Sequence, residues 1–194
     1  MERFIKWLVL GISIFITSNI SAQWGINGGC DFSSLTNCGE SKIQTGFHLG
    51  ATYDIALNSN FYFQPGLLFT SNGFNFQTSF YSEKKSVKMY ALEVPLNFSF
   101  SPKLGKNFKL ITDLGLYMRY GLFGNKEFKY LDETIKESSF VAYNRPDIGL
   151  NFGLGLGYKR VALIGSYQLG LTNAEKDISG MRHKKIRVTL RYLF

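Results

Sequence analysis

Residues that build catalytic and metal sites are scarce in this chain. It has two cysteines, Cys30 and Cys38, and two histidines, His48 and His183. A zinc site or a hydrolytic site needs several such side chains close together, and the strand pattern described below places the two histidines at opposite ends of the fold. We therefore expect no catalytic residue, no metal site and no cofactor, and we predict that the protein is not an enzyme.

Long apolar runs are also scarce. The run Trp7–Ile16, near the N-terminus, is shorter than the roughly 20 residues that a membrane-spanning helix needs. Two basic residues precede it, and the small residues Ser21 and Ala22 follow it. Because this order is typical of a secretory signal peptide, we predict a signal peptide at residues 1–22 and one domain at residues 23–194. The rest of the chain excludes a helical membrane protein.

The chain is moderately basic, with a formal net charge of +8 at pH 7. A basic surplus can bind nucleic acid or an anionic membrane surface. Since the predicted protein is exported and its charges are scattered along the chain, we expect no nucleic-acid partner and favour the membrane surface.

The compartment also bears on the cysteines. An oxidising environment allows Cys30 and Cys38 to form a disulfide that closes the short loop between them. Such a bond requires a specific geometry, which depends on the fold. A disulfide and two free thiols therefore stay equal alternatives.

Apolar and polar residues alternate along much of the chain. In the segment Lys42–Leu57, Phe47 and Leu49 lie on the apolar side, and His48 and Asp54 lie on the polar side. A period of two residues predicts a strand with one apolar and one polar face. The same period predicts eight strands, near residues 24–34, 42–57, 61–72, 87–100, 108–123, 146–158, 161–172 and 181–194.

The connections between these strands alternate in length. Two of them, Gly73–Ser86 and Gly124–Arg145, are long, whereas Asn58–Asn60 and Lys159–Arg160 are tight. Short periplasmic turns and long external loops are typical of outer-membrane barrels. We predict an all-β fold: an eight-stranded antiparallel up-and-down transmembrane β-barrel in the cell outer membrane, with long external loops and both termini on the periplasmic side.

Residue size predicts which face of each strand points inward. One face carries uniformly large apolar residues, and the other carries glycines and a few long polar residues. An eight-stranded barrel has room only for side chains, so the second face should line the lumen. Because buried charges must pair, we predict a lumen closed by an ion-pair network of Asp54, Glu93, Asp113, Asp147, Lys109, Arg119, Arg187 and Arg191.

Basic residues in the long loop 73–86 and at the start of the last predicted strand should lie at the external rim. Lys and Arg at that level can neutralise the phosphates of lipopolysaccharide, although an ordinary solvated loop explains them as well. The predicted rim contacts are Lys84, Lys85, Arg182, Lys184 and Lys185.

Several short motifs resemble one protein family. They are the segments 63–69 (FQPGLLF), 92–96 (LEVPL), 153–157 (GLGLG) and 167–173 (YQLGLTN), in that order. Together the chain resembles the PorT-like outer-membrane β-barrel family of Bacteroidetes-type bacteria. The resemblance implies an eight-stranded barrel without a settled biochemical activity, and its name-giving member is associated with protein secretion.

The end of the chain also resembles that of outer-membrane barrels, which commonly close on an aromatic residue. Tyr192 and Phe194 match this signal, which the barrel-assembly machinery reads during insertion. A last strand that is aromatic only because it reaches the membrane interface is the alternative.

These observations favour a non-enzymatic outer-membrane barrel with a filled lumen and a structural or interaction role through its external loops. Two alternatives stay open: a porin-like channel for small solutes, and a component of protein secretion or surface assembly. The expected partners are outer-membrane lipid, lipopolysaccharide, the assembly machinery and an unidentified surface or secretion partner.

Overall fold

The computed structural model describes residues 22–36, 41–78, 83–130, 133–138, 144–174 and 180–194. The predicted signal peptide lies outside these residues, apart from Ala22, and so stays a prediction. The described strands are β1 (Ala22–Leu35), β2 (Ser41–Lys42), β3 (Gln44–Ala56), β4 (Phe61–Thr78), β5 (Glu83–Phe100), β6 (Phe108–Tyr130), β7 (Glu133–Ser138), β8 (Pro146–Tyr158), β9 (Val161–Gly170) and β10 (His183–Leu193).

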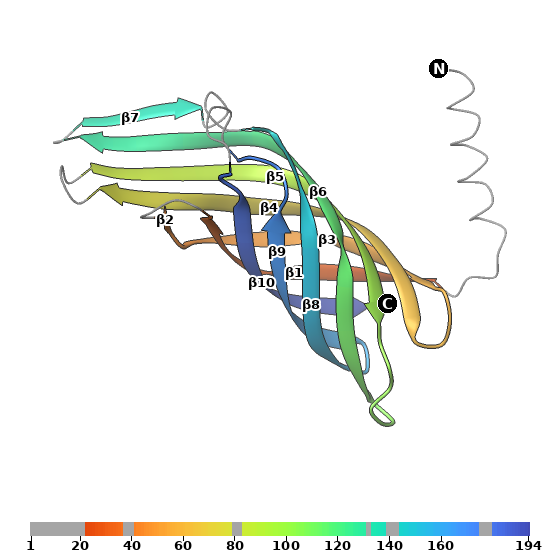
Figure 1. Cartoon of the computed structure of the whole chain (residues 1–194). Coiled ribbons are helices and arrows are strands. Elements are labelled where there is room, and N and C mark those ends of the chain that lie inside the picture. The colour runs from red at the N-terminus through yellow and green to blue at the C-terminus, as the bar shows by residue number, and fades with distance from the viewer. Residues whose placement is uncertain (1–21, 37–40, 79–82, 131–132, 139–143, 175–179) are drawn as a thin grey trace, which may run out of the picture.

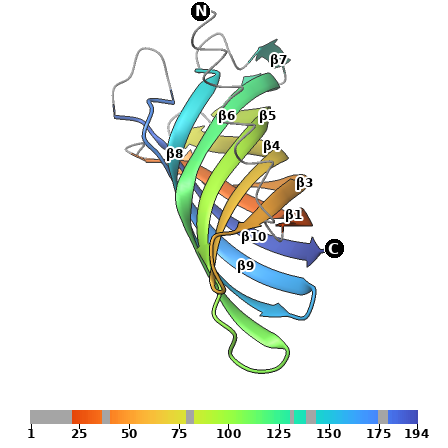
Figure 2. The same ribbon diagram turned by 90° about the vertical axis from the view of Figure 1, so that its right-hand side faces the viewer.

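Eight of these strands close into a barrel, as predicted. Each pairs with its neighbour in the order β1-β3-β4-β5-β6-β8-β9-β10, and β10 pairs with β1 to close the ring. All of the pairings are antiparallel. Figures 1 and 2 show the closed barrel from two sides. None of the described residues forms a helix with the length and hydropathy of a membrane span.

Tight turns mark one end of the barrel. The Asn58 carboxamide oxygen accepts hydrogen bonds from the backbone N–H groups of Asn60 and Phe61, which closes the turn between β3 and β4. Lys159 has a φ of 52° in the two-residue turn between β8 and β9, the left-handed conformation that such hairpins require. Both ends of the barrel chain also meet here, because Phe194 N–H donates to the carbonyl of Trp24. Short turns identify this as the periplasmic end.

At the opposite, external end, both of the predicted long loops are partly strand, so these two predictions were wrong. Residues Gly73–Ser86 are not one long loop, since β4 and β5 pair from Gly73↔Lys88 out to Thr78↔Glu83. Much of Gly124–Arg145 is strand as well, because β6 continues to Tyr130 and β7 pairs with it. The sequence 74–77 (FNFQ) already alternates apolar and polar residues, so the period of two continued where turn residues suggested a loop.

These extensions form a sheet beyond the barrel wall, which Figure 1 shows leaving the barrel on the left. We call it the projecting sheet; it consists of β2, residues 73–78 of β4, 83–88 of β5, 124–130 of β6, and β7. The pairing of β5 with β6 shifts register between Tyr90 and Ala91, two residues before the projecting sheet on the barrel side. Such irregularities increase strand bending and twist, so the shift contributes to the change of direction.

The barrel wall separates apolar from polar residues as predicted. In β3, Leu49 is 58% exposed on the outside, whereas His48 is 2% exposed on the inside. Aromatic pairs gather near the periplasmic end, where Trp24 contacts Tyr53 with ring centroids 4.8 Å apart. A second group near the external end brings Phe69 against Tyr90 at 6.0 Å. Apolar surface between two aromatic belts is typical of the membrane-facing wall of a barrel.

Glycines at two places in the wall should respond oppositely to substitution. A methyl group on Gly29 would overlap the carbonyl oxygen of Val188, whereas the atom nearest to a methyl on Gly165 is the Leu154 carbonyl oxygen at 3.8 Å. We expect Gly29→Ala to lower the free energy of unfolding by about 1 to 3 kcal/mol through overpacking. Gly165→Ala should leave it unchanged or raise it by up to about 1 kcal/mol. Urea unfolding of the refolded barrel measures both, and equal values would contradict this packing.

Candidate functional site

The lumen is filled by side chains that β1, β3, β4, β5, β6, β8, β9 and β10 direct inward, and its charged groups form two clusters. We call the first the external cluster, and it consists of Asp31, Glu93, Arg119, Asp147, Lys185 and Arg187. The second, the periplasmic cluster, consists of Asp54, Asp113, Arg191, Asn27 and Gln64.

Glu93 is the centre of the external cluster. Its carboxylate accepts hydrogen bonds from Arg119 Nη2 at 2.8 Å, Arg187 Nη1 at 2.8 Å and Gln168 Nε2 at 2.8 Å. The side chain is completely buried. An isolated charge at this depth would be strongly unfavourable, and the two guanidinium groups supply the compensating charge. Arg119 continues the network to Asp147, with Nη1 2.9 Å from the carboxylate.

Asp31 holds the other side of the external cluster. Its carboxylate accepts from Arg187 Nε at 2.9 Å and from Thr70 Oγ1 at 2.7 Å. Asp31 was absent from the predicted network. Its position between the outward residues Cys30 and Phe32 was the available signal, because the strand period places it on the inner face. With Asp31 included, the external cluster has three carboxylates and three basic groups.

Lys185 belongs to this cluster, so its predicted position at the external rim was wrong. The side chain is 2% exposed, and Nζ lies 3.1 Å from the Asp31 carboxylate. The reason is the period of β10: Ile186 and Val188 face outward, so Lys185 and Arg187 must face inward. Residue 185 lies inside the predicted strand 181–194, so this parity was already available from the sequence.

In the periplasmic cluster, most of the contacts are hydrogen bonds to side-chain amides, and few are ion pairs. Arg191 Nε donates to Asn27 Oδ1 at 2.8 Å, and its Nη2 donates to Gln64 Oε1 at 2.7 Å. Gln64 in turn donates to Asp54. Asp113 lies 3.7 Å from Arg191, too far for a hydrogen bond. Among the described residues, Lys109 forms no ion pair within 4 Å; its half-buried side chain lies over Gly157.

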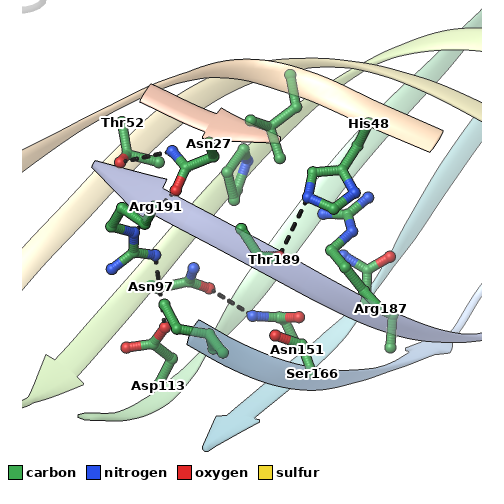
Figure 3. A pocket seen from close by; sticks show the side chains of 14 residues that line it. Asn27, His48, Thr52, Asn97, Asp113, Asn151, Ser166, Arg187, Thr189 and Arg191 are labelled. Carbon is green, nitrogen blue, oxygen red and sulfur yellow. Dashed lines mark hydrogen bonds and ion pairs between the residues drawn. The ribbon is translucent and has the colours of Figure 1, made fainter. Parts of the chain in front are cut away.

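A small cavity separates the two clusters. It has a volume of about 30 Å³, and His48, Asp113 and Arg191 are among its lining residues. Figure 3 shows these side chains converging from several strands. One carboxylate oxygen of Asp113 is buried there without a protein hydrogen-bond partner. Since one water needs roughly 10 to 15 Å³ measured in this way, the cavity has room for about two water molecules and none for a larger solute.

A histidine, a carboxylate and a hydroxyl do meet at this cavity. His48 Nδ1 lies 2.8 Å from the Asp31 carboxylate, and Nε2 lies 3.1 Å from Thr189 Oγ1. A carboxylate only accepts hydrogen bonds, so we assign the ring proton to Nδ1 and the Thr189 hydroxyl as donor to Nε2. Hydrolysis would also require space for a substrate and an oxyanion site. The small closed cavity favours a structural role for these three residues.

The remaining histidine lies apart from this group. His183 is half-buried at the start of β10 and lines a second cavity, of about 20 Å³, with Asp147 and Arg145. No group of three or more metal-ligating side chains occurs within the described part of the chain.

Four of the other predicted site residues, Arg182, Lys184, Tyr192 and Phe194, lie on the outer surface. Arg182 is exposed and Lys184 is half-buried, both at the external end of the wall. Lys84 and Lys85 fall within β5, not in a loop, and their side chains lie outside the described atoms. The rings of Tyr192 and Phe194 face outward with centroids 5.3 Å apart, and their role as an assembly signal stays a prediction.

Cys30 also faces outward and is exposed. Cys38 lies outside the described residues, so the two alternatives for the cysteines stay open.

Comparisons with known proteins agree with this architecture. The model of the family described as "Outer membrane protein beta-barrel domain" matches residues 17–175. No curated protein sequence matches the chain.

Three solved structures share the fold at low sequence identity. A major outer membrane protein from Thermus thermophilus is 13% identical, with a TM-score of 0.53, and the match covers 90% of this chain and 100% of that one. Neisserial surface protein A is 12% identical, with a TM-score of 0.52 and coverage of 90% and 99%. The outer membrane protein OprG from Pseudomonas aeruginosa is 12% identical, with a TM-score of 0.51 and coverage of 91% and 98%.

Proposed function

Because this chain belongs to the family of outer membrane protein beta-barrel domains, we propose that it is a non-enzymatic barrel with a closed lumen that contacts partners outside the cell through its projecting sheet. The length of three strands carries this proposal. A tilted strand crosses the hydrocarbon with about 9 to 11 residues, and β9 and β10 have 10 and 11. In contrast, β4 and β5 have 18 residues each, and β6 has 23.

The excess length lies at the external end, because the pairs Thr78↔Glu83 and Tyr130↔Glu133 lie opposite the periplasmic turns at Asn58 and Lys159. Seven or more additional residues in a strand extend it by about 23 Å. Building a paired sheet beyond the membrane costs conformational entropy and contributes nothing to spanning it. External extensions of a rigid scaffold commonly carry binding functions, which supports a contact role for the projecting sheet.

The edge of the projecting sheet supports the same role. Within the described part of the structure, β7 pairs only with β6. No described residue pairs with the other edge of β7, and an extended segment of a partner can add to such an edge by strand pairing. The partner itself is not specified by this geometry.

Shortening the projecting sheet tests this proposal. We would replace residues 74–87 by a two-residue Asn-Gly turn, since Gly73 and Lys88 are already paired and this dipeptide suits such a hairpin. Residues 126–137 would be replaced in the same way between the paired residues Asn125 and Ser138, which removes the β6–β7 hairpin. The barrel should still fold, as monitored by heat-modified migration in gels, while crosslinking on intact cells should lose the partners that the full chain captures. A shortened variant that keeps every crosslink would contradict the proposal.

The closed lumen makes a second prediction, which separates this proposal from the channel alternative. We expect no swelling of proteoliposomes in isotonic sugar and no stable conductance in planar bilayers, because the two cavities described inside the barrel have volumes of only about 30 and 20 Å³. An open porin reconstituted in parallel serves as the positive control. Steady conductance by the folded chain would favour the channel instead.

The assignment to the PorT-like group within this family stays a prediction. A role in protein secretion stays a prediction as well. Co-purification from crosslinked outer membranes distinguishes the two roles, because a secretion component should bring a stoichiometric periplasmic or membrane partner that binds independently of the projecting sheet.

A further inference from the structure

A groove lies at the external rim of the barrel, at the external ends of β8, β9 and β10. Its volume is about 590 Å³, within the range of about 300 to 1,000 Å³ that is usual for small-molecule sites. We call it the rim groove, and its lining residues are Asn144, Pro146, Leu171, Thr172, Asn173, Gly180 and Arg182.

The rim groove opens toward the membrane side of the wall. Along β9 the outward positions are odd-numbered, and Leu171 continues that series with 45% exposure. Along β8 the outward positions are even-numbered, and Pro146 is exposed beside Ile148. Arg182 continues the outward series of β10. Three neighbouring strands therefore present two apolar residues and one cation to the same space.

The height of the rim groove coincides with the boundary of the hydrocarbon. From Val161, in the periplasmic row of β9, to Leu171, the chain rises about 34 Å along the strand. A typical tilt of about 40° reduces this to about 26 Å along the membrane normal, compared with an apolar band about 25 Å tall. Leu171 thus lies at the outer edge of the lipid tails, and Arg182 lies at the level of the head groups.

Hydrogen bonds between separate segments hold the groove in shape. Thr36 N–H donates to the Arg182 carbonyl at 2.9 Å, and Arg182 N–H donates to Thr36 Oγ1 at 3.1 Å. Asn144 Nδ2 donates to the Asn173 carbonyl at 3.0 Å, and Asn173 Oδ1 accepts from Gly180 N–H at 3.1 Å. These contacts fix the backbone near residues 144, 173, 180 and 182, which line the groove. They leave the Arg182 guanidinium without a protein partner among the described residues.

A guanidinium in this position is suited to a phosphate, because it offers paired donors and a permanent positive charge. Lys184, one outward position below Arg182, adds a second cation beside Leu169. The apolar residues Pro146 and Leu171 continue the lipid-facing wall into the groove. We propose that the rim groove binds lipopolysaccharide of the outer leaflet, with Arg182 on a head-group phosphate and Leu171 against the first part of an acyl chain.

The test is a titration of the full refolded barrel in detergent with phosphorylated lipid A, followed by native mass spectrometry. We expect one tightly bound lipid A per barrel and about tenfold weaker binding for Arg182→Gln, the size of effect that loss of one charged hydrogen bond gives. Arg160→Gln is the matched control, because Arg160 is an exposed arginine in the periplasmic turn between β8 and β9. It should bind lipid A as the unmodified chain does.

Further ligands decide which part of the lipid is recognised. Lipid A without its phosphates should bind about as weakly as Arg182→Gln binds phosphorylated lipid A, and Leu171→Asn should also weaken binding of phosphorylated lipid A. Equal affinity of the Arg182 and Arg160 variants, or of lipid A with and without phosphates, would overturn the proposal. Displacement of lipid A by millimolar inorganic pyrophosphate would indicate a site for a free anion, and equally tight phosphatidylglycerol would exclude selection of lipopolysaccharide. Either result would also overturn it.

Discussion

Replacing Glu93 by alanine should lower the free energy of unfolding by about 3 to 5 kcal/mol, the cost of leaving buried charges without their partner. Glu93 accepts from Arg119, Arg187 and Gln168, and its removal leaves the external cluster with a surplus positive charge. Equilibrium unfolding in urea, followed by the fluorescence of the lipid-facing Trp24, measures the change. Lys103→Gln, in an exposed turn, deletes a charge without this effect and serves as the control.

A double-mutant cycle separates charge imbalance from the loss of packing. Glu93→Gln keeps the volume of the side chain but removes its charge, and Arg187→Gln removes the charge of one partner with a shorter side chain. The two changes together should cost less than the sum of the single changes, with a coupling of about 0.5 to 3 kcal/mol, because contacting residues are not additive. Purely additive losses, or a Glu93→Ala variant within about 1 kcal/mol of the unmodified chain, would contradict a central role for this carboxylate.

Leu49→Arg should destabilise the barrel by about 2 to 4 kcal/mol, the cost of a basic side chain near the middle of the membrane. Leu49 is 58% exposed on the outer face. It lies between Tyr53 of the periplasmic aromatic group and Phe47, whose ring contacts Phe69 of the external aromatic group at 6.1 Å. Refolding into phospholipid vesicles over a range of urea concentrations measures the difference.

Leu57→Arg is the matched control for this prediction. Leu57 is also an exposed leucine, at 56%, but it lies in the turn after β3 at the periplasmic end, where the same substitution should cost about 0 to 1 kcal/mol. Gly50 is unsuitable as a control, because any side chain there would overlap the Leu67 carbonyl oxygen. Equal costs for the two arginine variants would mean that the wall around Leu49 does not face lipid.

The strand pattern predicted most of the barrel because alternation is a local property. Each strand of the barrel buries one face, so the residue types at successive positions record which way each side chain points. The same rule correctly predicted that seven charged residues lie inside the barrel. The structure has all seven buried: Asp54, Glu93, Asp113, Asp147, Arg119, Arg187 and Arg191. Their partners could not be predicted in this way, because a partner depends on the register between strands that lie far apart in the chain.

Lys185 and Asp31 illustrate this limit. Both lie at inward positions of their strands. Lys185 was nevertheless predicted at the rim, and Asp31 was not predicted in the network. They lie 154 residues apart in the chain, and the register Ser33↔Lys185 places them near each other across the β1–β10 seam. That seam exists only because the barrel closes, so no local pattern contains the ion pair.

His48 and Cys30 show the difference between what the strand pattern determines and what the fold determines. The alternation alone determined that His48 faces inward and Cys30 outward. Only the tertiary structure decided that His48 lies between Asp31 and Thr189, that two charge clusters leave room for about two water molecules, and that three strands continue as a sheet outside the membrane. The direction of a side chain follows from its own strand, whereas closure, register and cavity volume follow from how all of the strands pair.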